Sequence, residues 1–169
     1  GRGLMSEAEQ EVKLLERLFN RFDSRSPLAV VNATAVGQSV KVEDELFMAL
    51  ELCEVFRQAT AGYFDVTATY AEVECDGRGG YALDGKEHKV RLLREGATID
   101  LGGFAKGYAA ESVRRLFERE GVAQAVINFG NSSIVAMGHH PYGEWWPIGV
   151  EHRKVKSAVA REVRLRDGA

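Results

Sequence analysis

The stretch DLGGFAKGYAAESV, from Asp100 to Val113, restricts the fold most, because it joins a strand pattern to a helix pattern across two glycines. Glycine has no Cβ, so the backbone at Gly102 and Gly103 can approach a ligand closely. The free amides and the dipole at a helix start form a site for anions. Lys106 lies in the first turn of this helix, where a cation is mildly unfavourable unless an anion is beside it.

Two interpretations of this junction remain open. In the first, a phosphate docks at the helix start, Lys106 becomes its partner, and Asp100 accepts hydrogen bonds from a base or a sugar at the same mouth. In the second, the glycines only let strand and helix pack closely, and Lys106 is solvated. The spacing matches neither the P-loop nor the GxGxxG motif, so neither a P-loop nucleotide hydrolase nor a Rossmann dehydrogenase is expected.

Helical and strand-type hydrophobic periodicity alternate along the rest of the chain. Helices are expected over 6–22, 42–61 and 104–121. Strands are expected over 63–74, 89–93, 97–101, 124–130, 132–138, 145–152 and 160–166. Residues 75–88 carry turn chemistry and are expected to form a loop. Because no linker divides these elements, one domain is expected over residues 1–169.

Local patterns predict how the first two helices begin and end. Ser6 and Glu9 have the spacing of a capping box at the start of the first helix. Gly62 is placed to cap the end of the second. Cys53, on the inner face of the second helix, is predicted to be a small buried group, and with Cys75 it forms neither a disulfide framework nor a metal cluster.

Composition excludes some classes of protein. The net charge of −3 over 169 residues does not indicate a nucleic-acid partner. No apolar run reaches the roughly 18 residues of a membrane span, and no signal peptide is recognised.

Asp167 and Gly168 form a hairpin-turn signal that no return strand follows. We therefore expect the fold to be incomplete at its C-terminus, with further polypeptide or a second chain completing it.

Several linked motifs resemble those of one known family. They are LLERLFNRFDSRSPLAVVN, ATAGYFDVT, IDLGGFAKGYAAESVRRLFEREGVAQAVINFGNSSIVAMG and WWPIGVEH, in this order along the chain. Together they resemble the ApbE family of FAD:protein FMN transferases, over nearly the whole chain. The resemblance implies an α+β fold of T-fold-like modules, with helices packed on a mostly antiparallel sheet.

The resemblance also implies ligand contacts. Positions that match the family's FAD contacts are Phe22, Tyr63, Phe64, Asp65, Asp100 and Lys106. The position of Gly103 matches a backbone carbonyl that binds Mg²⁺ in the family. For several of these residues a structural role stays open: Phe22, Tyr63 and Phe64 could be core aromatics, and Asp65 could cap a turn.

By resemblance, the chain moves FMN from FAD onto a Thr or Ser of an acceptor protein, through a phosphoester bond and with Mg²⁺. The side chains that bind Mg²⁺ in the family match positions after residue 169, so activity of this chain alone is doubtful. Two alternatives remain: a non-catalytic flavin-binding or structural remnant of the same fold, and an FAD pyrophosphatase. The resemblance implies the bacterial cell envelope or periplasm, and the cytoplasm is not excluded.

Overall fold

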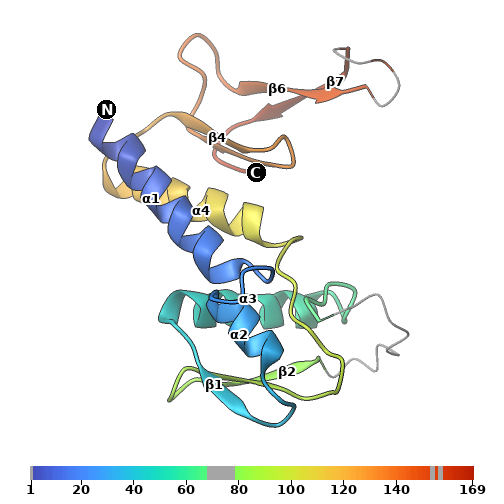
Figure 1. Cartoon of the computed structure of the whole chain (residues 1–169). Helices are drawn as coiled ribbons and strands as arrows, with labels where there is room; N and C mark the ends of the chain where they lie inside the picture. Colours follow the sequence, from blue (N-terminus) through green and yellow to red (C-terminus); the bar gives the residue numbers. More distant parts are fainter. Residues whose placement is uncertain (1, 68–78, 153–154, 156–157) are drawn as a thin grey trace. The chain divides into compact units, whose positions relative to one another are not determined.

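The computed structural model describes residues 2–67, 79–152, 155 and 158–169. In this part of the chain four helices and seven strands form (Figure 1). The helices are α1 (Arg2–Phe19), α2 (Pro27–Ala33), α3 (Asp44–Ala59) and α4 (Ala105–Arg119). The strands are β1 (Ser39–Lys41), β2 (Tyr81–Asp84), β3 (Lys89–Leu92), β4 (Ala125–Phe129), β5 (Ser133–Met137), β6 (Trp146–Glu151) and β7 (Val159–Leu165). Every pairing among these strands is antiparallel, and the predicted α+β class is confirmed.

The chain divides into two compact units. Unit A comprises Val12–Ala105, and unit B comprises Gly1–Glu11 together with Lys106–Ala169. Helix α1 therefore contributes its first part to unit B and its second part to unit A. The expectation that residues 1–169 make one domain stays a prediction.

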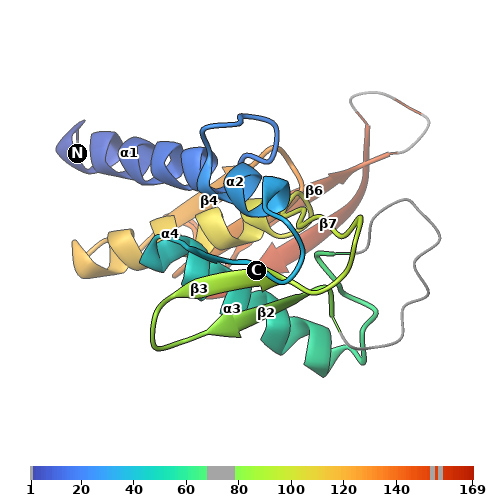
Figure 2. The same cartoon turned by 60° about the horizontal axis from the view of Figure 1, so that its bottom comes forward.

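In unit A, helix α3 covers one face of a three-stranded sheet of strand order β1-β3-β2 (Figures 1 and 2). The Tyr81 hydroxyl on β2 donates a hydrogen bond to the Leu50 carbonyl of α3 at 2.9 Å. The ring of Phe47 on α3 stacks on His88, with 4.6 Å between the ring centroids. The core of the unit contains fully buried aliphatic side chains from the helices, from β3 and from the segment before α4: Leu28, Leu46, Leu50, Val90, Ile99 and Leu101.

Helix α1 ends at Phe19, earlier than the sequence pattern predicts. The Asn20 side chain accepts hydrogen bonds from the backbone N–H groups of Phe22 at 2.9 Å and Asp23 at 3.3 Å. These bonds replace helical ones, so Phe22 lies in a turn and not on the buried stripe of the helix. Helix α2, which begins at Pro27, was not predicted from the sequence. Proline is favourable at the first position of a helix, and this explains why α2 can begin there.

The predicted capping box is wrong. Helix α1 begins at Arg2, so Ser6 and Glu9 lie inside it and not at its first turn. Arg2, Leu4 and Met5 are all favourable helix formers, which explains why helical structure extends ahead of Ser6.

Helix α3 ends near the predicted glycine, but the left-handed cap starts one residue earlier. Ala61 adopts φ +51° and Gly62 φ +87°. The Gly62 N–H donates to the Arg57 carbonyl at 2.8 Å, and the Ala61 N–H donates to the Gln58 carbonyl at 3.1 Å. This is the bond pattern of a Schellman motif with Ala61 in the position that glycine usually takes. Helix α4 ends in the same way with Gly121 in that position, at φ +73°.

Two predicted strands are not found in the described residues. Residues 63–67 make turns and bends, and the remainder of that expectation, 68–74, lies outside the described residues. Residues 97–101 form no strand with any part of the chain that the structure describes. Instead, the Asn32 side chain donates to the Ile99 carbonyl at 2.9 Å and accepts from the Ile99 N–H at 2.8 Å. A side-chain amide thus satisfies the backbone groups that a neighbouring strand would otherwise pair.

The four strands predicted over 124–130, 132–138, 145–152 and 160–166 form in unit B, where they pair as two hairpins, β4–β5 and β6–β7. The first part of α1 lies beside α4, where the Ser112 hydroxyl donates to the Glu11 carboxylate at 2.5 Å. After β7, Asp167 adopts φ +48°, which suits the predicted turn. Gly168 then forms an antiparallel bridge with Ala136 of β5, with N–H···O distances of 2.8 and 3.1 Å. The predicted turn residues therefore pair with the neighbouring hairpin.

Cys53 is buried in α3, as predicted, and burial raises the pKa of its thiol to about 12. Cys75 lies outside the described residues. Among the helices that the structure describes, none combines the length and the apolar character that crossing a membrane requires.

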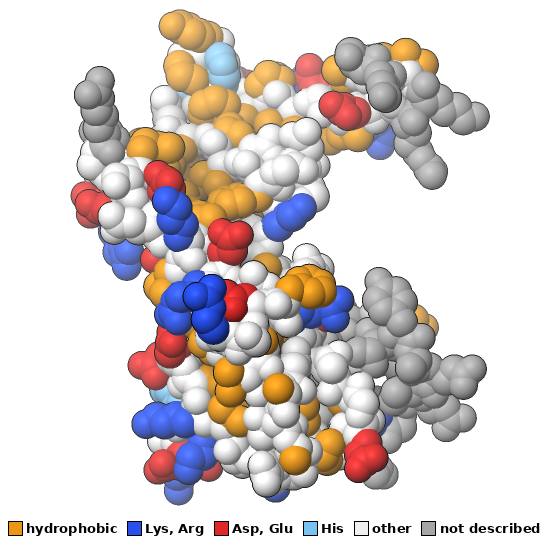
Figure 3. Space-filling model, viewed as in Figure 1, with side chains coloured by type: hydrophobic (Ala, Val, Ile, Leu, Met, Phe, Trp, Pro, Cys, Tyr) orange, Lys and Arg blue, Asp and Glu red, His pale blue; other side chains and the backbone are white. Residues whose placement is uncertain are grey.

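The surface carries mixed charge. Basic and acidic side chains are interspersed on the face that Figure 3 shows. Some form ion pairs along one helix, as on α4, where Glu111 lies 2.6 Å from Arg114 and 3.0 Å from Arg115. The hydrogen bond from Arg114 lowers the pKa of the Glu111 carboxyl.

Candidate functional site

The Asp100 side chain shapes the backbone that leads into helix α4. Its Oδ1 accepts a hydrogen bond from the Gly102 N–H at 2.8 Å, which makes a tight turn. The Asp100 N–H donates to the Val66 carbonyl at 2.8 Å. Gly102 and Gly103 are both exposed, and a Cβ built on Gly103 would have no neighbour within 4 Å among the described residues. The two glycines therefore lie on open surface where a ligand can approach the backbone.

Asp65 lies in unit A on the segment that bonds to Asp100. Its Oδ1 accepts hydrogen bonds from the Thr67 N–H at 2.8 Å and from the Thr67 hydroxyl at 2.6 Å. The Thr67 hydroxyl oxygen in turn accepts from the Gly80 N–H at 3.0 Å. Asp65 thus caps a turn, as the structural alternative expected. Because Val66 bonds to Asp100, the structure brings the two predicted aspartate segments together.

The three predicted aromatic contacts differ in burial. Phe22 is 83% exposed and Tyr63 is 98% exposed, so the core interpretation of both residues is wrong. Phe64 is half-buried and meets Phe56 edge to face, with 6.0 Å between the ring centroids. Two aromatic rings of unit A are therefore free of the core, as residues that stack on a flat ligand must be. Their role as FAD contacts stays a prediction.

Arg21 is a residue of this region that the sequence analysis missed. Its Nε lies 3.3 Å from Oδ2 of Asp100, and its guanidinium carbon lies 4.6 Å from the centre of the Phe22 ring. Asn32 was also missed, although it holds Ile99 directly before Asp100. Proximity in sequence to Phe22 was the only signal for Arg21, and nothing local indicated its contact with Asp100.

Lys106 lies in unit B, in the first turn of α4, and is exposed. Its ammonium group lies near the Gly130 backbone, where a built Cβ would be 3.5 Å from Nζ. Gly130 adopts φ +62°, so a side chain there would be strained as well as close to the lysine. The prediction that Lys106 belongs to the same binding site as Asp65 and Asp100 stays a prediction.

The described residues do not fit a magnesium site. Mg²⁺ requires near-octahedral oxygen coordination, and the Gly103 carbonyl supplies one ligand at most. No cluster of three or more His, Cys, Asp or Glu side chains that could hold a metal occurs in the described part of the chain. Unit A does contain two exposed aromatic rings, an aspartate carboxylate and open glycine backbone, which are groups that can contact a flavin nucleotide.

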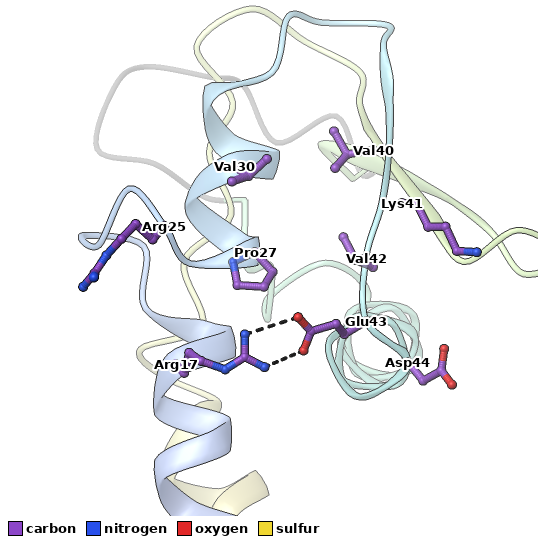
Figure 4. A pocket seen from close by; sticks show the side chains of 9 residues that line it. All are labelled: Arg17, Arg25, Pro27, Val30, Val40, Lys41, Val42, Glu43 and Asp44. Carbon is purple, nitrogen blue, oxygen red and sulfur yellow. Dashed lines mark hydrogen bonds and ion pairs between the residues drawn. The ribbon is translucent and has the colours of Figure 1, made fainter.

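A cavity of about 810 Å³ lies elsewhere in unit A, between the end of α1, α2, β1 and the start of α3 (Figure 4). Arg17 and Glu43 form a double hydrogen bond across its lower end, at 3.2 and 2.6 Å. Arg25 points away from the cavity and pairs with Asp23 at 3.0 Å. Both arginines already have carboxylate partners, so neither offers an unpaired charge to a phosphate. It contains none of the predicted contacts; its lining residues are Arg17, Arg25, Pro27, Val30, Val40, Lys41, Val42, Glu43 and Asp44.

Comparison with solved structures supports the fold. The chain superimposes on the ApbE protein of Thermotoga maritima with a TM-score of 0.83 and 22% identity, covering 99% of this chain and 60% of that one. The H257G mutant of the flavin transferase ApbE from Vibrio cholerae gives a TM-score of 0.77 with 15% identity, covering 98% and 61%. At these identities the likeness concerns the fold.

Sequence comparison identifies curated relatives. The FAD:protein FMN transferase of Treponema pallidum (strain Nichols) is 25% identical over 176 residues, which covers 88% of this chain and 44% of the relative. That of Klebsiella pneumoniae (strain 342) is 38% identical over 63 residues, which covers 37% and 18%. The chain thus spans less than half the length of these curated relatives. The sequence model of the ApbE family matches residues 3–169, and the chain belongs to the ApbE family.

Proposed function

We propose that this chain carries the FAD-binding part of a flavin transferase that moves FMN from FAD to an acceptor protein. The observation that carries the proposal is the turn at Asp100. It presents a carboxylate and open glycine backbone at the start of α4, on the segment that bonds to the Asp65 turn. This geometry occurs at the family's central motif, in a chain whose curated relatives are FAD:protein FMN transferases.

The proposed reaction exchanges one phosphate linkage for another. A phosphorus–oxygen bond of the FAD pyrophosphate breaks, and AMP leaves with the electron pair. A new bond joins the FMN phosphorus to the hydroxyl oxygen of a Thr or Ser on the acceptor, and the hydroxyl proton is released. The barrier is the negative charge on the phosphate oxygens, which positioned donors and cations stabilise.

The residues of this chain would bind and orient FAD. Phe22 and Tyr63 offer exposed rings for stacking, and the Asp100 carboxylate accepts hydrogen bonds from a base or a sugar. Lys106 and the first amides of α4 supply positive charge to the pyrophosphate. The Mg²⁺ that the family resemblance implies is not assigned a step, because the described residues do not fit its coordination shell.

The second candidate is a flavin-binding protein without transfer activity. The observation that favours it is the lack of a carboxylate cluster for a metal in the described part of the chain. An FAD pyrophosphatase is the third possibility, in which water replaces the acceptor hydroxyl. All three share FAD binding and differ in the products.

One experiment separates these candidates. The purified chain is titrated with FAD and followed by flavin fluorescence. It is then incubated with FAD, Mg²⁺ and an acceptor protein bearing a Thr or Ser target. A mass increase of the acceptor together with AMP release supports the transferase, and AMP release with free FMN indicates the pyrophosphatase. Binding without either product, both by this chain and by the native protein purified from its host, indicates the non-catalytic protein, and absence of binding contradicts the proposal.

The Asp100→Asn variant provides the site-specific control. It keeps the shape of the side chain but removes its charge, so FAD affinity is expected to fall by about tenfold. Glu120→Gln removes an exposed carboxylate after the end of α4 and should bind FAD like the wild type. Equal affinities of both variants would contradict the assignment of Asp100.

The compartment is also a proposal. The family resemblance supports the bacterial cell envelope or periplasm. Fractionation of the native host with an antibody against the chain tests this, and recovery in the cytoplasmic fraction alone would contradict it.

A further inference from the structure

Arg21 connects two predicted FAD contacts that lie far apart in the sequence. Its Nε is 3.3 Å from Oδ2 of Asp100, and its guanidinium covers one face of the Phe22 ring at 4.6 Å. Asp100 also binds the Gly102 N–H through Oδ1. One arginine therefore contacts both a carboxylate and an aromatic ring, and the carboxylate shapes the glycine turn.

The contact between Arg21 and Asp100 is an ion pair without a hydrogen bond. The Nε atom is buried, and it makes no hydrogen bond with any part of the chain that the structure describes. A buried donor without a partner is unfavourable, and native proteins usually satisfy such groups. A small movement of Asp100, whose Oδ2 lies 3.3 Å away, would satisfy it.

A purely structural role explains these contacts poorly. The side chains of Arg21 and Asp100 are 31% and 41% exposed, and ion pairs at such exposure contribute little to stability. Phe22 is 83% exposed, so the arginine does not hold this ring in the core. The guanidinium covers one side of the ring, and the exposure of Phe22 leaves ring surface available for another flat group.

We propose that Arg21 is a positioning residue of the FAD site: it holds the Phe22 ring and the Asp100 carboxylate in one arrangement, so that FAD meets both together. This inference rests on the proposed function. The charge of Arg21 keeps Asp100 turned toward the loop after α1, and its planar guanidinium keeps Phe22 oriented for stacking. Loss of Arg21 should therefore weaken the contacts of FAD with both residues.

The test compares FAD binding by Arg21→Gln, Arg21→Lys and Arg25→Gln. Arg25 belongs to the same loop, pairs with Asp23 at 3.0 Å, and has an 89% exposed side chain, so it is the matched control. Arg21→Gln should lower FAD affinity by about tenfold, and Arg21→Lys should restore part of it because the charge returns without the planar group. Arg25→Gln should bind like the wild type.

Three further readouts separate positioning from a general structural effect. If Arg21 acts through Asp100 and Phe22, Arg21→Gln should cost less affinity in an Asp100→Asn background than in the wild type, because only its effect on Phe22 remains. The change in flavin fluorescence on binding should be smaller in Arg21→Gln than in the wild type, because the Phe22 ring is less well oriented. The melting temperature of the free protein should change little.

The outcomes distinguish this inference from the proposed function. If the wild type binds no FAD, the proposed function fails. If the wild type binds FAD and Arg21→Gln binds it equally well, the positioning role is wrong while the proposed function stands. Additive losses in the double variant, or a large fall in melting temperature for both Arg21 variants, would also overturn it.

Discussion

At the scale of single residues, the arginine of the candidate site differs from two other arginines of unit A in how it is paired. Arg17 and Arg25 pair fully with neighbouring carboxylates. Arg21 instead shares its guanidinium between Asp100 and an exposed ring, with a buried donor left without a hydrogen bond. A buried donor without a hydrogen bond is unusual in a native protein, which sets Arg21 apart from the other two arginines.

Lys106→Ala tests the other predicted cation. We expect FAD binding to weaken by about 1–3 kcal/mol, the usual contribution of a charge-assisted contact. Stability should stay within about 0.5 kcal/mol of the wild type, because Lys106 is exposed and lies in a first helical turn. Calorimetric titration and thermal unfolding measure the two effects, with the exposed Lys86→Ala as control. Unchanged affinity would leave Lys106 as a solvated surface residue.

Cys53 gives a prediction for pH dependence. Burial raises the pKa of the folded-state thiol from its ordinary 9.0 to about 12. Between these values the unfolded chain loses a proton that the folded chain keeps, so the contribution of Cys53 to stability is complete below pH 9 and falls as the pH rises toward 12. Urea unfolding of the wild type and Cys53→Ala at several alkaline pH values should show a steeper decline for the wild type. Parallel declines would contradict the burial effect.

At the scale of elements, the two Schellman motifs differ in the residue at the left-handed position, which is alanine in one and glycine in the other. Helix α4 ends with Gly121 at the left-handed residue, whereas α3 ends with Ala61. A Cβ in the left-handed region is unfavourable, so α3 carries a strain that α4 avoids. This strain lies directly before Tyr63, Phe64 and Asp65, the segment predicted to contact FAD.

Ala61→Gly is expected to stabilise the protein by about 0.5–1 kcal/mol, because relief of the left-handed strain exceeds the added freedom of the unfolded chain. The matched control is Ala59→Gly, the same change in the last turn of α3, which should destabilise by about 0.5–1 kcal/mol. Denaturant unfolding measures both. Loss of stability in both variants would show that Ala61 is not strained.

At the scale of the whole molecule, the predicted FAD contacts are distributed over both units. Phe22, the aromatic and aspartate segment after α3, and Asp100 belong to unit A, and Lys106 belongs to unit B. Whether FAD contacts both units can be tested on each unit separately.

Hydrogen exchange with and without FAD tests this coupling. We expect protection on FAD binding at 20–22, 63–67 and 100–103 of unit A, and also at the first turns of α4 in unit B. Protection arises where the ligand removes opening motions of the backbone. Protection confined to unit A would contradict the predicted contact of FAD with Lys106. Protection of unit B at its hairpins alone would place the ligand elsewhere.

The sequence by itself determined the elements whose bonds are local. Helices α3 and α4 follow their hydrophobic periodicity, and strands β4 to β7 follow their alternating patterns. The family motifs, read in order, also led to the family and to the α+β class. In each case the residues that interact lie close along the chain, so their spacing carries the information.

Only the tertiary structure decided the residues that depend on distant partners. Residues 97–101 have the composition of a strand, but the Asn32 amide binds the Ile99 backbone in place of a strand. Phe22 continues an apolar stripe, but Asn20 ends the helix and leaves the ring exposed beside Arg21. The contact of Arg21 with Asp100 joins two loops that no local pattern relates. Hydrogen bonds and ion pairs between distant segments compete with local preference, and their outcome depends on how the whole chain packs.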